Sequence, residues 1–206
     1  MDIGIYGGTF DPVHKGHVRL AETAAQSCGL DKLIILPDRI PPHKQAEGLA
    51  EGRDRAEMCR LAFARLRDAE ISEWELAQQG KSYSVLSLRH FKERYPEDRL
   101  WFIMGSDMLT SFHTWYRYEE ILTLSGLICM SRYKGDDAEL EASADRLRAQ
   151  GGRIRIVAAE AFEVSSSEIR QRLKNGDDCT GLLDEAVLDY IRAKGLYGTS
   201  SDRGSI

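Results

Sequence analysis

Short apolar runs alternate along the chain with longer stretches in which apolar and charged residues recur at helical spacing. The apolar runs, which predict strands, occupy residues 2–6, 32–37, 99–104, 126–132 and 153–157, and residues 69–76 alternate like a strand with one covered face. Helical patterns occupy residues 18–25, 51–67, 85–94, 138–150 and 182–195, and one more begins after Ser165. This alternation predicts an α/β fold with a doubly wound, mostly parallel sheet between two helical layers, and a ligand site at the C-terminal edge of the sheet.

The segment Gly7–His17 joins the first predicted strand to the first predicted helix. Adjacent glycines at 7 and 8 let the backbone approach a bulky anion, and the helix N-terminus supplies unpaired N–H groups and a partial positive charge. Because His14 and His17 are three residues apart, both imidazoles project from one side of the first helical turn. The pattern predicts a phosphate site suited to phosphoryl or nucleotidyl transfer; the alternative is a glycine turn followed by two solvent-exposed histidines.

Three other motifs do not fit this segment. The glycines lack the G-x-G-x-x-G spacing of a dinucleotide-binding turn. Lys15 precedes Gly16, whereas a Walker loop needs the lysine after the glycine. The two histidines lack the four-residue spacing and the glutamate of a zincin, which argues against zinc.

Length and composition limit the remaining possibilities. At 206 residues the chain predicts one domain, over residues 1–198, with a disordered polar tail at 199–206. No apolar run approaches the length of a membrane span, and the net charge of −5 argues against a general nucleic-acid binder. Four scattered cysteines without a C-x-x-C pair predict reduced thiols in a cytoplasmic protein. The oligomeric state is left open.

Two loops that follow predicted strands add candidate ligand contacts. Pro41 and Pro42 exclude helix after the second strand and predict an extended loop that turns Lys44 toward the phosphate site. After the strand at 99–104, Gly105 lets a ligand lie against the backbone, and Asp107 can accept hydrogen bonds from ribose hydroxyls.

The aromatic stretch 112–118 and the serine-rich stretch Ser165–Arg170 each support a structural and a functional interpretation. Large rings in a polar stretch either pack into the core or offer a stacking face to a flat ligand. Ser165 and Glu168 have the spacing of a capping box. The same helix start can bind a second anion, with Arg170 one turn in as a phosphate clamp.

Two of these motifs carry a family resemblance. Gly8–His17 resembles the signature of the H-x-G-H nucleotidyltransferase superfamily, and Ser165–Arg170 resembles its S-S-T-x-I-R signature with Ser167 in place of threonine. The motifs Pro41–Lys44, Gly80–Ser84 and Trp115–Tyr116 follow in the order of the bacterial nicotinate-nucleotide adenylyltransferase family. The resemblance covers about residues 1–197 and implies a Rossmann-like nucleotidyltransferase fold.

The resemblance also implies roles for individual residues. It implies that the transferring phosphoryl group is stabilised by His14, His17, Lys44 and Arg170. The ATP-binding residues that it implies are Gly8, Thr9, Phe10, His14, His17, Gly105, Asp107, Ser165, Ser166, Ser167 and Arg170. The acceptor-binding residues that it implies are Lys44, Tyr83, Ser84, Trp115 and Tyr116, with Trp115 stacked on the pyridine ring.

The reaction implied by the resemblance joins ATP and nicotinate mononucleotide to give deamido-NAD and pyrophosphate, as a step in NAD biosynthesis. Mg²⁺ is expected to arrive on the ATP, and no protein-built metal site is expected. Two alternatives stay open. One is a sister transferase acting on phosphopantetheine or a cytidylyl-transfer substrate, and the other is a non-catalytic nucleotide sensor on the same fold.

Overall fold

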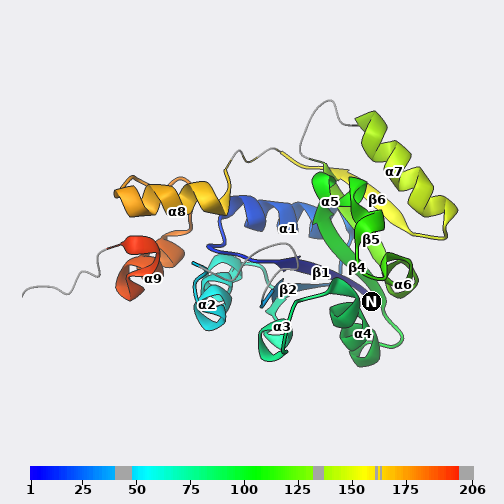
Figure 1. The fold of residues 1–206 in the computed structure, drawn as a ribbon, viewed down its shortest axis with the longest axis horizontal. Helices are drawn as coiled ribbons and strands as arrows, with labels where there is room; N and C mark the ends of the chain where they lie inside the picture. The colour runs from blue at the N-terminus through cyan, green and yellow to red at the C-terminus, as the bar shows by residue number, and fades with distance from the viewer. Residues whose placement is uncertain (40–47, 132–136, 161, 163, 200–206) are drawn as a thin grey trace, which may run out of the picture.

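The computed structural model describes residues 1–39, 48–131, 137–160, 162 and 164–199 (Figure 1). Its strands are β1 (Asp2–Gly8), β2 (Lys32–Pro37), β3 (Ala69–Ile71), β4 (Arg99–Gly105), β5 (Gly126–Ser131) and β6 (Ile154–Ala158). They form one sheet in the order β3-β2-β1-β4-β5-β6, and every neighbouring pair is parallel. The order reverses between β1 and β4, which is the place where open α/β sheets bind ligands.

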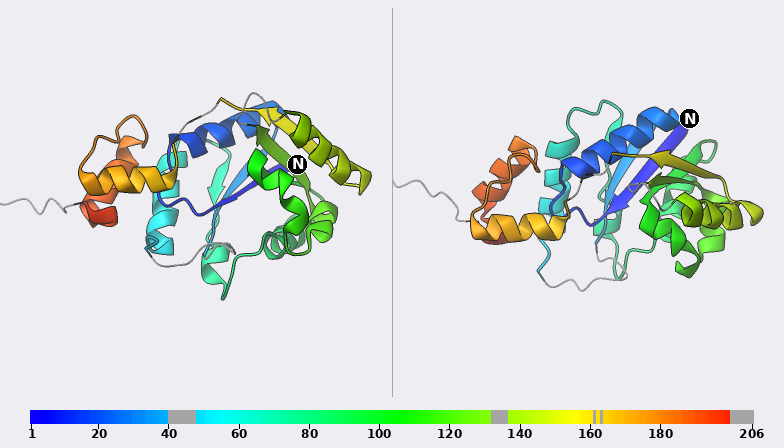
Figure 2. Two further views of the ribbon diagram at one scale, coloured as in Figure 1. Left: turned by 45° about the horizontal axis from the view of Figure 1, so that its top comes forward. Right: turned by 90° about the horizontal axis from the view of Figure 1, so that it is seen from above.

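Helices cover both faces of the sheet (Figures 1 and 2). The α-helices are α1 (Lys15–Cys28), α2 (Gly52–Phe63), α3 (Trp74–Ala77), α4 (Ser84–Arg94), α5 (Ser106–Thr110), α6 (Tyr118–Leu124), α7 (Asp137–Ala149), α8 (Ser166–Asn175) and α9 (Glu185–Lys194). Two 3₁₀ turns are η1 (Phe112–Thr114) and η2 (Leu196–Gly198). Figure 2 shows α8 and α9 beyond one end of the sheet and α7 at the opposite end.

The core consists of two apolar clusters, one on each face. Side chains of a strand point alternately to the two faces, so Tyr6 joins one cluster while Ile3 and Ile5 join the other. The Tyr6 cluster packs against α1, α2, α8 and α9, and the Ile3 cluster packs against α4, α5, α6 and α7. Four of the strands are buried on both faces, which explains their continuous apolar runs.

The α/β prediction is confirmed: the sheet is parallel throughout, and α1 begins at Lys15. The strand predicted at 69–76 is wrong beyond Ile71, because the chain turns into α3 at Trp74. The helical turn buries Glu75, which accepts a hydrogen bond from Ser87, and it stacks Trp74 on His90 with 4.6 Å between ring centroids. An alternating pattern of short length does not distinguish this arrangement from a strand.

Other boundaries differ from the pattern by small amounts. The helix predicted at 51–67 ends at Phe63, and the short helices α5 and α6 were not predicted. Across the described part of the chain, we find no helix with the length and apolar character of a membrane span. The four cysteines are free. Thr199, the first residue of the predicted tail, donates a hydrogen bond to the Leu196 carbonyl at 2.8 Å, and residues 200–206 lie outside the described part.

Candidate active site

The connection from β1 to α1 is closely packed around its two histidines. A Cβ atom on Gly16 would lie 2.8 Å from the Phe162 ring and 3.0 Å from the His14 ring, so only glycine fits there without displacing a ring. Phe10 has a φ of 50° and lies 5.2 Å from His17 between ring centroids, with its ring edge-on. The side chains of Phe10 and Phe162 therefore enclose the histidine pair.

His14 and His17 lie together, as their spacing predicts. His14 is the N-cap residue of α1, its backbone N–H donates to Nδ1 of His17 at 3.2 Å, and the two rings stack with centroids 3.7 Å apart. Because Nδ1 of His17 accepts this hydrogen bond, the neutral ring carries its proton on Nε2, a tautomer assigned from the hydrogen-bond pattern. The protonated nitrogen Nε2 is therefore a donor and not an acceptor. The alternative of two solvent-exposed histidines is wrong, because His14 is buried.

The start of α8 is fixed against the same loop. Ser166 Oγ donates to the Pro12 carbonyl at 3.0 Å, and Arg170 Nη1 donates to the Asp11 carbonyl at 2.7 Å. Arg170 Nη2 also donates to Ser167 Oγ at 3.2 Å. These contacts join segments that lie more than 150 residues apart in the chain and bring two helix N-termini to one loop. Both helix starts present N–H groups with no partner inside their helix.

The capping box predicted at this helix start is confirmed in its main contact. Ser165 is the N-cap residue of α8, and its Oγ accepts a hydrogen bond from the Glu168 backbone N–H at 3.1 Å. The structural interpretation of the serine run is therefore correct. The anion-binding interpretation of Ser165, Ser166 and Ser167 stays a prediction. It is compatible with the cap, because the contact of Ser167 Oγ with Arg170 places the serine run beside the predicted phosphate clamp.

A buried arginine that the sequence analysis did not assign to the site connects the next group of residues. Arg55 is only 2 % exposed, and its Nη1 donates to the Thr9 carbonyl at 2.7 Å and lies 3.5 Å from Asp38 Oδ1. Thr9 Oγ1 in turn donates to Asp38 Oδ2 at 3.0 Å. The sequence does contain a signal for this burial, because Arg55 lies on the apolar stripe of its helix. The spacing i, i+3, i+4, i+7 is met by Arg55, Met58, Cys59 and Ala62.

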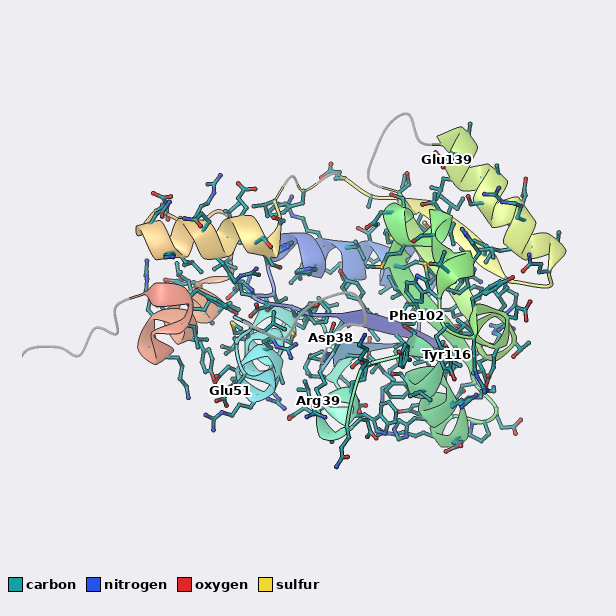
Figure 3. The ribbon with its side chains drawn as sticks, viewed as in Figure 1. Asp38, Arg39, Glu51, Phe102, Tyr116 and Glu139 are labelled. Atoms are coloured by element: carbon teal, nitrogen blue, oxygen red, sulfur yellow. The ribbon has the colours of Figure 1, made fainter. Side chains whose placement is uncertain are left out.

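The predicted acceptor residues at 83, 84 and 116 come together around the start of α4. Tyr83 is the N-cap residue of α4 and Ser84 is its first residue, so the Ser84 N–H belongs to the donors that have no partner inside the helix. The Tyr83 and Tyr116 rings lie 4.9 Å apart between centroids, and Tyr116 is 52 % exposed. Figure 3 shows Tyr116 and Phe102 near α4.

Trp115 packs against the core as well as lying in the predicted acceptor segment. Its ring centroid is 5.9 Å from that of Phe102 and 5.3 Å from that of Phe112, and the side chain is half-buried. The same Phe102 ring lies beside Gly7, where an added Cβ atom would be 3.6 Å from it. The aromatic stretch thus reaches the end of β1 through Phe102, and its stacking role stays a prediction.

Glu75 is a second residue that the sequence analysis did not connect to the site. It is buried, and burial raises the pKa of its carboxyl group, an effect opposed by hydrogen bonds from Ser87 and Ser82. Ser82 Oγ also accepts a hydrogen bond from the Arg39 backbone N–H at 3.0 Å. Glu75 therefore anchors the loop that leads into Tyr83 and α4.

The remaining predicted residues lie at the C-terminal edge or outside the described part. Residues Tyr6 and Ile103 are paired between β1 and β4, so Gly8 and Gly105 end neighbouring strands at the same edge of the sheet. Gly105 is the N-cap residue of α5, and Asp107 is exposed in its first turn. Lys44 lies outside the described residues, so its phosphate contact stays a prediction.

Comparison with known proteins identifies the family. Residues 5–172 match the cytidylyltransferase-like family model. Nicotinate-nucleotide adenylyltransferase of Bacillus subtilis (strain 168) is 35 % identical over 195 residues, which cover 95 % of this chain and 97 % of that protein.

Solved structures agree on the fold. The structure of Plasmodium falciparum nicotinic acid mononucleotide adenylyltransferase complexed with NaAD is similar with a TM-score of 0.78 at 20 % identity, covering 97 % of this chain and 98 % of that chain. The same Plasmodium enzyme complexed with APC gives a TM-score of 0.77. The fold is therefore that of a nucleotidyltransferase with a Rossmann-like sheet. Because the Bacillus subtilis protein is similar over nearly its whole length, the chain belongs to the nicotinate-nucleotide adenylyltransferase family.

Proposed function

We propose that this protein transfers the adenylyl group of ATP to nicotinate mononucleotide, giving deamido-NAD and pyrophosphate. The observation that carries the proposal is the convergence of α1 and α8 on one loop, held by the hydrogen bond from Arg170 to the Asp11 carbonyl at 2.7 Å. The convergence gathers two imidazoles, a guanidinium and two positive helix ends for a polyphosphate to meet. The names of the relatives support nicotinate mononucleotide as the acceptor.

In the proposed reaction a phosphate oxygen of nicotinate mononucleotide forms a bond to the α-phosphorus of ATP. The bond from that phosphorus to the bridging oxygen breaks, and its electron pair leaves with pyrophosphate. No covalent protein intermediate is needed, so the work of the site is alignment and neutralisation of developing charge. We assign that work to His14, to the Nε2–H of His17 and to Arg170, with Lys44 as a further cation.

We assign the binding sites of the adenosine and of the acceptor to the loops around the phosphate site. We assign the nucleoside of ATP to Gly105 and Asp107, at the end of the strand next to β1. The acceptor is assigned to Tyr83, Ser84 and Tyr116 at the start of α4, and to Trp115, which precedes Tyr116 in the chain. The exposed Tyr116 ring and the open Ser84 N–H support an acceptor that is flat and anionic.

Magnesium is part of the proposal as a companion of ATP. Within the described residues, no group of three or more His, Cys, Asp or Glu side chains has the arrangement of a metal site. The hydrogen-bond donors around the histidines are cationic or neutral and do not ligate a metal ion. They fit a metal ion that is held by the phosphate oxygens of ATP. When bound there, Mg²⁺ would offset the charge of the leaving pyrophosphate. The four free thiols support the cytoplasmic setting that the sequence predicts.

The test is an acceptor panel. The protein is incubated with ATP, Mg²⁺ and either nicotinate mononucleotide, nicotinamide mononucleotide or phosphopantetheine, and pyrophosphate release and the dinucleotide product are measured. Replacing ATP by CTP tests the cytidylyl alternative in the same assay. The proposal requires the largest kcat/KM for ATP with nicotinate mononucleotide. ATP binding without turnover of any acceptor would instead support a nucleotide sensor.

A further inference from the structure

The C-terminal turn η2 reaches back to the loop between β1 and α1. Tyr197, in this turn, has a φ of 57°, a left-handed conformation that bulky residues adopt rarely. Gly195 and Gly198 on either side have φ values of 62° and 80°, so the chain makes a tight turn there. The turn packs against α8, the helix that carries Arg170. Strained residues of this kind persist where surrounding contacts hold them, and they concentrate at functional sites.

The contact that holds Tyr197 is a hydrogen bond to a buried carboxylate. Its hydroxyl donates to Oδ1 of Asp11 at 2.6 Å, and Asp11 is only 1 % exposed. The Ala50 backbone N–H donates to the same Oδ1 at 3.1 Å. Burial and the negative charge of Asp11 raise the pKa of Tyr197, so its hydroxyl stays protonated and remains a donor.

The other carboxylate oxygen of Asp11 faces Arg170 without forming a hydrogen bond. Among the described residues, Oδ2 of Asp11 has no hydrogen-bond partner, and it lies 3.5 Å from Arg170 Nη1. Nη1 donates instead to the Asp11 carbonyl at 2.7 Å, and Nη2 donates to Ser167 Oγ at 3.2 Å. Two donors thus hold the carboxylate by Oδ1, and the guanidinium approaches it without a direct charged hydrogen bond.

We infer that Tyr197 is a positioning residue: it holds the Asp11 carboxylate in an orientation that leaves the charge of Arg170 available for the polyphosphate of the nucleotide. Without the hydroxyl, the Ala50 N–H remains as the hydrogen-bond donor to Oδ1, and the carboxylate is free to shorten the existing 3.5 Å ion pair between Oδ2 and Arg170 Nη1 into a charge-assisted hydrogen bond. Charge-assisted pairs of this kind are strong when buried from water. Asp11 would then hold the guanidinium of Arg170 more tightly and compete with phosphate for it. This inference rests on the proposed nucleotide site but does not depend on the identity of the acceptor.

The chain offers a matched control for the experiment. Tyr190 in α9 donates its hydroxyl to a second buried carboxylate, Asp54 in α2, at 2.8 Å. The variants Tyr197→Phe and Tyr190→Phe each remove one hydrogen bond from a tyrosine hydroxyl to a buried carboxylate, but only the first affects Asp11. We expect Tyr197→Phe to weaken ATP affinity by about tenfold, the effect of one charge-assisted contact, and Tyr190→Phe to leave it unchanged. Isothermal calorimetry with ATP and Mg²⁺ measures both, and melting curves show that both variants are folded.

A second variant separates positioning from simple structural support. Asp11→Asn keeps an acceptor for Tyr197 and Ala50 but removes the charge that competes for Arg170. We expect ATP affinity to rise at least twofold in Asp11→Asn. In the Asp11→Asn background, Tyr197→Phe should cause no loss of ATP affinity. Additive losses in the double variant, an affinity loss in Asp11→Asn alone, or equal losses in the two tyrosine variants would overturn the inference.

Kinetics distinguish this inference from the proposed function. In turnover assays that compare Tyr197→Phe with the wild type, KM for ATP should rise in the variant, while KM for nicotinate mononucleotide stays within twofold of the wild-type value. If no acceptor is turned over by the wild type, the proposed function fails, but the calorimetric comparison still decides the role of Tyr197.

Discussion

The backbone N–H of His14 donates to Nδ1 of His17 at 3.2 Å, and the two rings stack with centroids 3.7 Å apart. This contact fixes the orientation of the His17 ring through the backbone of His14, and it leaves Nε2 as the protonated nitrogen. One histidine therefore orients the other, and the motif H-x-G-H has a geometric reason beyond the supply of two imidazoles. Gly16 between them is needed because a Cβ atom there would lie 2.8 Å from Phe162.

Substitution of His17 should remove a preorganised donor to the transferring phosphoryl group. We expect His17→Ala to lower kcat by at least about a hundredfold, the usual effect of losing one such donor, while the affinity for ATP changes less. Steady-state kinetics and ATP calorimetry measure the two effects. His113→Ala removes an exposed histidine from η1 and serves as the control. Near-normal turnover of His17→Ala would show that the central assignment is wrong.

The planar fork of Arg170 predicts an effect for a substitution that keeps its charge. Arg170→Lys cannot bond the Asp11 carbonyl and Ser167 in the same geometry, so we expect ATP affinity to fall by about tenfold. Arg172→Lys is the matched control, since Arg172 pairs with Glu168 on the exposed side of the same helix. Superimposable ATP titrations for Arg170→Lys and the wild type would leave Arg170 with a structural role alone.

The sheet could be predicted from the sequence because its central strands are buried on both faces. Residues 100–104 form a run without a charged position, and a parallel sheet covered by helices on both faces explains it. The end of β3 could not be predicted in the same way. In the alternating pattern over 69–76, Glu75 counts as a polar and therefore exposed position. In the structure it is buried in the helical turn α3, and the sequence pattern does not reveal that a carboxylate is buried.

The candidate site could be predicted where a motif is local in the chain. His14 and His17 lie on one helical turn, so their spacing determines their proximity. The contacts of Arg55 with Thr9 and of Tyr197 with Asp11 join segments far apart in sequence, and no local pattern encodes which loops meet. Trp115 shows the same limit, because its partner Phe102 comes from β4.

Glu75 predicts a pH dependence of stability. Burial raises the pKa of its carboxyl group in the folded protein above the ordinary value of 4.5. Between these two pKa values the folded state binds the proton more tightly than the unfolded state, so stability falls as the pH rises through that range. We expect Glu75→Gln, which keeps hydrogen-bonding groups without the charge, to lose less stability than the wild type over the same rise. Urea denaturation from pH 4 to pH 8 measures the difference, and the exposed Glu93→Gln should follow the wild type.

Trp115 allows the acceptor assignment to be separated from core packing. The ring contacts Phe102 and Phe112 and is half-buried, so Trp115→Ala should lower stability, by less than the roughly 3–5 kcal/mol of a fully buried tryptophan. If the ring also stacks on the pyridine, nicotinate mononucleotide affinity should fall by about one to two orders of magnitude, by analogy with the roughly 1–3 kcal/mol of base–aromatic stacking. ATP affinity should hardly change, since the groups assigned to its phosphates, His14, His17 and Arg170, come from the starts of α1 and α8.

The control for Trp115 is Trp74, a half-buried ring that stacks on His90 away from the α1 and α8 starts. Trp74→Ala should lower the melting temperature without a selective effect on either substrate. Trp115→Phe should recover most of the acceptor affinity, because a phenyl ring can still stack on a pyridine. Titrations of ATP and nicotinate mononucleotide with a melting curve for each variant make the comparison. If the affinities for both ligands fall together in Trp115→Ala, in proportion to its lowered stability, Trp115 is a packing residue. The selection of nicotinate mononucleotide over other phosphorylated acceptors would then depend on Tyr83, Ser84 and Tyr116.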